Sequence, residues 1–199
     1  KYINVVGGEA NLKAISTIVM KADVTIPGAP FVPEATMRQK FPNKYSQKIE
    51  ANMQGQKITI TKTTFNGERG YSEVQGQRID FDENQLDESK KIKGIFEELY
   101  FEPGELELVS INSVNDEDAY KLKVTIDGKE SHRYYSVESG LLLSTEETDD
   151  NNNVNTTNYS DYQSVNNVML PFFMELPGQK LEFKMTSIEL NKELKDSSF

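Results

Sequence analysis

The sequence of 199 residues contains no cysteine, one histidine and no long apolar run. Without cysteine the chain has no disulfide, no thiolate nucleophile and no cysteine-ligated metal. Its longest apolar runs, such as residues 170–174, are far shorter than the ~20 residues that a membrane-spanning helix needs. These absences exclude several classes of enzyme and metalloprotein, and they leave the cellular compartment open.

Basic residues are also scarce relative to acidic ones. There are 22 Lys and Arg residues against 32 Asp and Glu residues, which gives a formal net charge of −10. This charge repels phosphate backbones and anionic lipid surfaces unless the basic residues are segregated, and no basic stripe occurs. We therefore expect no nucleic-acid partner. The length suits one domain with a sizeable core, so residues 1–199 are expected to form a single domain.

What the sequence does contain is a hydrophobic period of two, which is typical of half-buried strands. Turn signals such as Asn66-Gly67 and Asn166-Asn167 repeatedly interrupt this alternation. The pattern predicts strands over residues 16–81 and 105–190, with the clearest hairpin at residues 159–176. Antiparallel hairpins of this number form a sheet of roughly ten or more strands that curls strongly. Its concave face must then be filled by side chains, by a helix or by a ligand.

Two segments depart from the strand pattern. Residues 1–15 predict an N-terminal helix packed across the start of the sheet. The pattern of residues 82 to about 100 predicts an inserted amphipathic helix, with Asp82 or Asp87 as its N-cap. Its apolar stripe has helical spacing and consists of Ile92, Ile95, Phe96 and Leu99. Residues 191–199 form a polar tail that we expect to fray.

His132 is the only histidine, and a zinc site built on it would need carboxylates as all of its other ligands, which is rare. A catalytic triad would also lack a nucleophile-elbow motif. We therefore expect a histidine on the surface or rim, no metal, no cofactor and no catalytic set.

The clusters of acidic and Asn residues are also expected to be solvated rather than functional. Asp149, Asn151 and Asn153 imitate the alternating oxygen ligands of a calcium loop, but Val154 stands where Gly is required and Ser160 where a bidentate Glu is required. A solvated hairpin loop is the expectation there. The neighbouring carboxylates Glu97-Glu98 and those of residues 116–118 do not face each other as a catalytic pair would, so we expect them on solvated faces.

The apolar faces contain the main functional signal. All six methionines, Met20, Met37, Met53, Met169, Met174 and Met185, fall in predicted strands. Methionine is flexible and polarisable, so such a face can adapt to a varied lipophilic guest, although an ordinary core could also use these residues.

Several stretches together resemble a known superfamily. They are Tyr2-Ile3-Asn4 through Gly7-Gly8 to Leu12 and Ile15; Phe65-Asn66-Gly67 with Gly70-Tyr71; residues 118–122; and Tyr159-Ser160-Asp161-Tyr162 with Val165, Val168, Leu170 and Pro171. The chain is similar over nearly its whole length to the outer-membrane lipoprotein-sorting (LolA/LolB-like) superfamily of Bacteroidetes-type bacteria. The resemblance is closest to the C-terminal accessory domain of insulinase-type zinc peptidases.

The resemblance implies an incomplete, strongly curved antiparallel β-barrel whose mouth is covered by helices and whose apolar cavity accepts acyl chains. On this resemblance the inserted helix is expected to be a lid helix, and the residues expected to line the cavity or the lid are Met20, Ala22, Val24, Met37, Phe41, Ile92, Ile95, Phe96 and Leu99. It implies a non-catalytic periplasmic domain, either free or associated with the outer membrane, that binds a lipophilic ligand, an acylated lipoprotein segment or a partner domain. The alternative is a structural C-terminal module of a zinc peptidase, whose His-x-x-Glu-His helix this sequence does not contain. The carriers also use an arginine inside the lid, and no arginine here matches it. We expect a mature protein or an excised domain from which any leader is missing.

Overall fold

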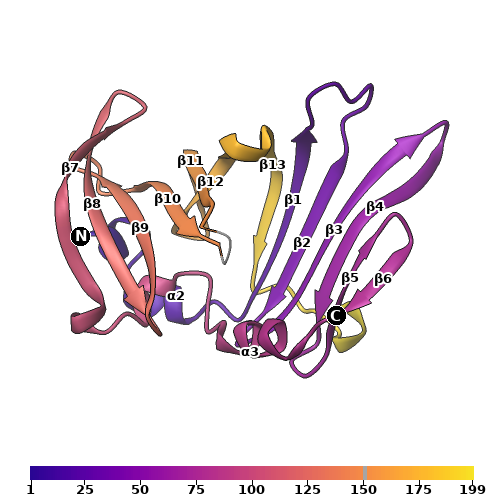
Figure 1. Cartoon of the computed structure of the whole chain (residues 1–199), viewed down its shortest axis with the longest axis horizontal. Helices are drawn as coiled ribbons and strands as arrows, with labels where there is room; N and C mark the ends of the chain where they lie inside the picture. Colours follow the sequence, from indigo (N-terminus) through magenta and orange to yellow (C-terminus); the bar gives the residue numbers. More distant parts are fainter. Residues whose placement is uncertain (150–151) are drawn as a thin grey trace. The chain divides into compact units, whose positions relative to one another are not determined.

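The computed structural model describes residues 1–149 and 152–199, and the chain divides into two compact units. Unit 1 comprises Lys1–Leu12 and Glu97–Glu182, and unit 2 comprises Lys13–Phe96 and Phe183–Phe199. Asn151, which belongs to the loop considered above as a calcium site, lies outside the described residues. The 13-stranded antiparallel sheet confirms the mainly β fold class expected from the sequence (Figure 1).

In unit 2, the strands β1 to β6 follow one another as hairpins and pair with antiparallel neighbours, and β13 joins them from the end of the chain. Their spatial order is β6-β5-β4-β3-β2-β1-β13, so β6 is an edge strand. Turns with positive φ at both central residues, Gln54-Gly55 and Gln75-Gly76, have the twist that two-residue hairpins favour. The strand bounds are β1 (Thr17–Thr25), β2 (Glu34–Lys40), β3 (Lys44–Met53), β4 (Gln56–Phe65), β5 (Gly70–Val74), β6 (Gln77–Asp80) and β13 (Leu181–Leu190).

One face of the unit 2 sheet is apolar and the other is polar. Residues directly opposite each other in an antiparallel ladder share a face. The register therefore places a row of Ala22, Ala35, Ile49, Thr61 and Val74 across five strands on the apolar face. The opposite face includes ion pairs, such as Lys48 with Glu50 at 2.6 Å.

The strands of unit 1 have the order β12-β11-β10-β9-β8-β7, and β7 is an edge strand. The hairpin predicted at residues 159–176 is confirmed, since β11 and β12 turn at Asn166 and Asn167, which both have positive φ. The bounds are β7 (Leu106–Val114), β8 (Glu117–Ile126), β9 (Lys129–Ser136), β10 (Leu142–Thr148), β11 (Val154–Val165) and β12 (Val168–Leu176).

The N-terminal helix is broken in two, which corrects the prediction of one helix over residues 1–15. It forms α1 (Tyr2–Val5) and α2 (Glu9–Lys13). Gly7 and Gly8 between them have φ angles of 140° and 81°, which an α-helix does not accommodate. A Cβ on Gly7 would lie 2.8 Å from the Asn167 carbonyl oxygen, so only glycine allows this close approach to the β11–β12 turn.

The predicted lid helix is much shorter than expected. The helix α3 (Glu83–Lys91) begins with a capping box between Asp82 and Gln85, and its C-cap Ile92 is already extended. The apolar stripe predicted for this helix lies beyond its end, so that part of the prediction is wrong. Lys90 and Lys91 in the last turn and Gly94 just beyond are ordinary signals of a helix C-terminus.

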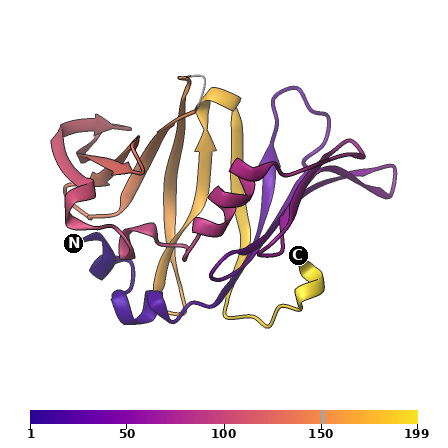
Figure 2. The same ribbon diagram turned by 60° about the horizontal axis from the view of Figure 1, so that its bottom comes forward.

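Helix α3 lies at the end of the unit 2 strands where β3 begins and β4 ends (Figures 1 and 2). Ser89, its one buried residue, is hydrogen-bonded through its hydroxyl to the Tyr45 hydroxyl of β3 at 2.9 Å. Three short 3-10 helices follow elsewhere in the chain, η1 (Glu97–Leu99), η2 (Pro103–Glu105) and η3 (Pro177–Gln179). Within the described residues, no helix has the length and apolar character needed to cross a membrane.

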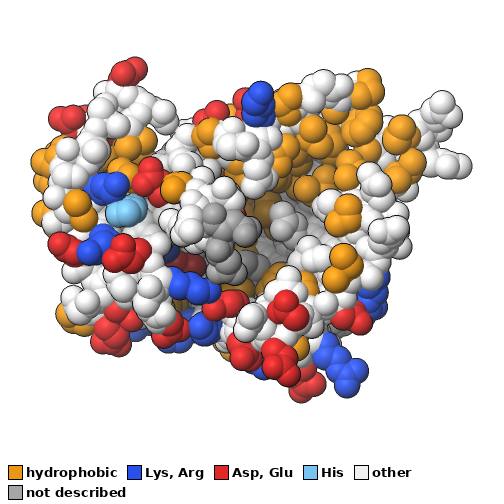
Figure 3. Space-filling view, viewed as in Figure 1, with side chains coloured by type: hydrophobic (Ala, Val, Ile, Leu, Met, Phe, Trp, Pro, Cys, Tyr) orange, Lys and Arg blue, Asp and Glu red, His pale blue; other side chains and the backbone are white. Residues whose placement is uncertain are grey.

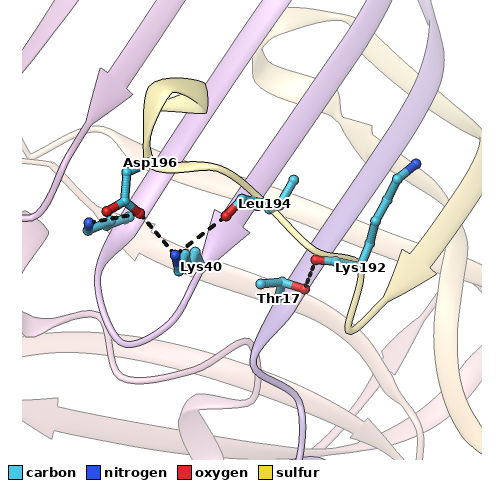
Figure 4. A network of polar contacts seen from close by, with 6 residues as sticks. Thr17, Lys40, Lys192, Leu194 and Asp196 are labelled. Carbon is cyan, nitrogen blue, oxygen red and sulfur yellow. Dashed lines mark hydrogen bonds and ion pairs between the residues drawn. The ribbon is translucent and has the colours of Figure 1, made fainter.

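The polar tail contacts unit 2 along the ends of β1 and β2 and closes with a further 3-10 helix, η4 (Asp196–Ser198). Thr17 donates to the Lys192 carbonyl oxygen at 2.7 Å, and Lys40 donates to Asp196 at 2.9 Å and to the Leu194 carbonyl oxygen at 3.4 Å (Figure 4). These contacts hold residues 191–199 against β1 and β2, although the polar composition of this segment predicts that it frays.

Candidate functional site

The sequence-predicted residues of β1 and β2 do come together. Met20 and Met37 are direct cross-strand partners on the apolar face, and Ala22 pairs with Ala35 next to them. Both methionines are half-buried, whereas Ala22 and Val24 are 1% and 0% exposed. The methionines can therefore reach a ligand on this face, while Ala22 and Val24 contribute core packing.

The other predicted residues do not form a helical lid. Phe41 follows β2 and is half-buried, with its N–H donating to the Ser16 carbonyl oxygen. Ile92, Ile95 and Phe96 lie on the irregular segment after α3, and Phe96 is only 5% exposed. Leu99 belongs to η1 in unit 1. Since Phe96 is part of the core, a polar substitution there would unfold the protein rather than report on a ligand.

Unit 2 contains an open groove of about 630 Å³ that none of these nine residues lines. It is bordered by the β1–β2 connection, by β4 and by the turn between β5 and β6. Its volume lies in the range of small-molecule sites in proteins. The apolar lining residues are Ile26, Ala29, Phe31, Ile58 and Ile60, and the polar ones include Thr59, Glu73 and Gln75.

Exposed apolar side chains surround this groove. Figure 3 shows hydrophobic side chains gathered over the β1–β2 and β3–β4 ends of unit 2. Ile58 is 45% exposed, and Met53 and Val74, which share the apolar face with it, are 46% and 51% exposed. Covering the open half of these three side chains would contribute about 3 kcal/mol to the binding of a lipophilic ligand.

A second cluster, which we call the Arg133 cluster, lies inside unit 1. Arg133 of β9 is 7% exposed and is the only charged side chain in the buried core of the described residues. Its Nη2 donates to Glu97 Oε2, and Tyr135 donates to Glu98 Oε1 at 2.8 Å. Tyr2 packs against Tyr135 with ring centroids 5.0 Å apart. The cluster therefore joins η1 and α1 to strand β9.

Burial dominates the electrostatics of the Arg133 cluster. It raises the pKa of the Glu98 carboxyl, against the opposing effect of the Tyr135 hydroxyl and Arg133. Burial also raises the pKa of Tyr2, Tyr135 and Tyr162 far above the usual range, so these hydroxyls stay neutral. For Arg133, burial opposes the charge, but Glu97 and Glu98 outweigh it and raise the pKa.

The sequence missed the Arg133 cluster. Glu97 and Glu98 were expected on a solvated face, which is wrong for Glu98, whose carboxyl is half-buried and hydrogen-bonded. The Nε atom of Arg133 is buried and has no hydrogen-bond partner among the described residues. The one feature of the sequence that marks this cluster is the run Arg133-Tyr134-Tyr135, which places an arginine beside two tyrosines on one strand.

His132 points to the other face of β9, away from Arg133, as alternation along a strand requires. Its Nδ1 lies 3.8 Å from Glu146 Oε2, and Tyr134 donates to the same carboxylate at 2.7 Å. In residues 1–149 and 152–199, no group of three His, Asp or Glu side chains has the arrangement needed to hold a metal ion.

Comparison with solved structures defines the class of fold. A DUF1329 family protein from Desulfovibrio piger superposes with a TM-score of 0.61 at 12% identity, covering 96% of this chain and 92% of that one. A LolA superfamily protein from Nitrosomonas europaea gives 0.57 at 14% identity, covering 98% and 96%. The chain thus shares the fold of these proteins.

A putative outer-membrane lipoprotein-sorting protein domain from Vibrio parahaemolyticus is also similar, with a TM-score of 0.57 at 9% identity, covering 92% of this chain and 88% of that one. No protein-family model and no curated protein matches the sequence. The resemblance to the lipoprotein-sorting superfamily is therefore supported at the level of fold. None of these three structures is described as a peptidase, so the link to insulinase-type zinc peptidases stays a prediction.

Proposed function

We propose that this chain is a non-catalytic periplasmic domain that binds a lipophilic ligand, such as an acyl chain or an acylated protein segment, in the groove of unit 2. The observation that carries the proposal is the groove itself, about 630 Å³ in volume and lined by Ile26, Phe31, Ile58 and Ile60. The half-exposed apolar side chains beside it add surface that a ligand would cover.

Two further features support this function. The Met20–Met37 pair offers adaptable side chains on the apolar face of the same sheet. The polar lining residues Thr59 and Gln75 can hydrogen-bond the head of an amphiphile whose tail lies on the apolar side chains. The shared fold with lipoprotein-sorting domains agrees with such a role, and the periplasmic location rests on that likeness.

The test is titration of the purified chain with a fluorescent fatty acid. We expect saturable fluorescence enhancement, and we expect Ile58→Asp and Phe31→Asp to weaken it at least tenfold, which corresponds to about 1.4 kcal/mol. Ile79→Asp is the matched control, since Ile79 is 68% exposed and lies outside the groove lining. Absence of probe binding, or equal loss in the control, would show the proposal to be wrong.

A further inference from the structure

Unit 2 contains a second pocket, which we call the Tyr71 pocket and which includes Thr64, Tyr71 and Asp80 in its lining. Its volume is about 330 Å³, and it shares no lining residue with the groove. These three residues lie opposite one another across β4, β5 and β6, so they share one face of the sheet. Alternation along β5 places Tyr71 on the face opposite to Val74, and therefore opposite to the apolar face. The pocket is thus separate from the groove.

The Arg78 side chain of β6 is held in place at this pocket by two neighbours. Its Nε donates to Asp80 Oδ1 at 2.8 Å, and its Nη2 lies 2.7 Å from the same oxygen. Its guanidinium lies 3.8 Å from the centre of the Tyr71 ring, within the range of a cation–π interaction. A guanidinium has five N–H groups, and Asp80 accepts from two of them. Arg78 therefore keeps N–H groups that a ligand can use, on a side chain whose position is already fixed.

The other polar groups of the pocket also offer hydrogen-bond donors. The side chain of Arg69, in the turn between β4 and β5, has no partner among residues 1–149 and 152–199. Asn66 accepts the backbone N–H groups of Glu68 and Arg69 through Oδ1, so its Nδ2 group remains a donor. The Tyr71 hydroxyl accepts from Lys62 at 2.7 Å, which leaves its own proton available. In a chain with a net charge of −10, this donor-rich lining favours an anion.

Apolar side chains form another part of the lining. Phe81 follows β6, Leu86 belongs to α3 and Phe199 follows η4, and all three are half-buried. The β5 and β6 strands and residue 199 lie at the same end of unit 2 (Figure 1). The volume is at the lower end of the range of small-molecule sites. The pocket therefore suits a compact ligand with one apolar part and one anionic part.

We propose that the Tyr71 pocket binds a small organic acid, whose carboxylate lies on Arg69 and Arg78 and whose apolar body lies against Phe81 and Leu86. Arginine suits this role because its planar guanidinium matches the geometry of a carboxylate. A neutral compound of the same shape would lose the ion pairs, and an inorganic anion would lose the apolar contacts. The site is a second binding site, independent of the lipophilic groove.

The first experiment titrates benzoate into the isotope-labelled chain and follows the amide resonances by NMR. We expect saturable shifts at Tyr71, Arg78 and Leu86. Benzamide has the same shape without the charge and should bind about tenfold more weakly, because the charge-assisted hydrogen bonds are lost. Inorganic phosphate, which has no apolar body, should also bind more weakly than benzoate. Absence of saturable shifts with benzoate, or equal binding of benzoate and either other compound, overturns the proposal.

The second experiment tests the arginines by substitution. Arg69→Met should weaken benzoate binding about fivefold, as expected for an ion pair near solvent, and the fold should be kept because this side chain has no partner among the described residues. Lys184→Met is the matched control, since it removes one positive charge of unit 2 outside the pocket lining. Ile58→Asp, which changes the groove, should also leave benzoate binding unchanged. Unchanged binding in Arg69→Met, or equal weakening in Lys184→Met or Ile58→Asp, overturns the proposed site.

Discussion

Arg133 of β9 donates a hydrogen bond to Glu97, a residue 36 positions earlier in the chain. This bond and the neighbouring one from Tyr135 to Glu98 fix η1 against the sheet of unit 1. Arg133 is much more buried than Glu97, since the side chain of Arg133 is 9% exposed and that of Glu97 is 63% exposed. Loss of the arginine therefore affects the core far more than loss of Glu97.

Arg133→Met keeps much of the aliphatic stem and removes the charge. We expect it to lower the free energy of unfolding by about 2 kcal/mol, less than the 3–5 kcal/mol typical of a fully buried pair because water can solvate Glu97. Urea unfolding followed by circular dichroism measures the change. Arg69→Met, at an exposed position, is the control and should change stability by no more than about 0.5 kcal/mol. Equal effects of the two variants would contradict a structural role for Arg133.

Glu98→Gln tests the buried carboxyl through its pH dependence. Because burial raises the pKa of Glu98 in the folded state, the folded protein binds the proton more tightly than the unfolded chain does. Protonated Glu98 therefore contributes fully to the free energy of unfolding at pH values below its pKa in the unfolded chain. This contribution is lost as the pH rises through the higher pKa of Glu98 in the folded protein. We expect the stability of Glu98→Gln relative to the natural chain to increase between pH 4 and pH 8. A constant difference across urea titrations at these pH values would refute this.

Gly70→Ala tests a close contact in unit 2. A Cβ at this position would lie 2.3 Å from the Phe81 ring and 2.9 Å from the Thr64 carbonyl oxygen. Overpacking of this kind typically costs about 1–3 kcal/mol. Gly104→Ala is a matched control, since a Cβ there meets nothing within 4 Å. Thermal unfolding should therefore separate the two variants, and similar melting temperatures would show that Phe81 moves aside freely.

Lys40→Ala tests how the tail is held. Lys40 and Lys44 hydrogen-bond to Asp196 and lower the pKa of its carboxyl. The stabilisation from this contact is therefore fully present above the ordinary pKa of an aspartate, and it is lost as the pH falls through the lowered pKa of Asp196. We expect the amides of Ser198 and Phe199 to exchange several-fold faster in the variant, as measured by hydrogen–deuterium exchange. Lys57→Ala removes an ion pair with Glu34 away from the tail and should leave these amides unchanged.

The strands and turns could be predicted because their signals are local. Alternation along β1 and the Asn166-Asn167 turn each depend on residues that are neighbours in sequence. The spacing of Ile92, Ile95 and Phe96 misled the prediction of α3, because apolar residues on an irregular segment can share a helical spacing by chance. Lys90, Lys91 and Gly94 were the more reliable signals of where the helix ends.

The site was less predictable than the fold. Met20 and Met37 were predicted to share one face because each lies on an alternating strand, and their pairing follows from the register of β1 and β2. The groove is formed partly by the β1–β2 connection, where Ile26 and Phe31 have no periodic pattern to mark them. The Arg133 cluster depends on tertiary contacts, and no spacing rule joins residues that far apart. Sequence periodicity predicts which side chains share a face of the sheet. Grooves and buried polar pairs depend instead on how the loops pack against that face.

The contacts between the start of β1 and the segment after β13 determine when unit 2 can fold. Ser16 is hydrogen-bonded to Asn191, and Thr17 to Lys192, each across 175 positions of the sequence. On a ribosome adding about 5–20 residues per second, β1 therefore waits on the order of 10–30 s for its β13 neighbour. During that interval the nascent sheet has an open edge at β1. Completion of unit 2 is thus a late event in biosynthesis, because it requires the two ends of a very long loop to meet.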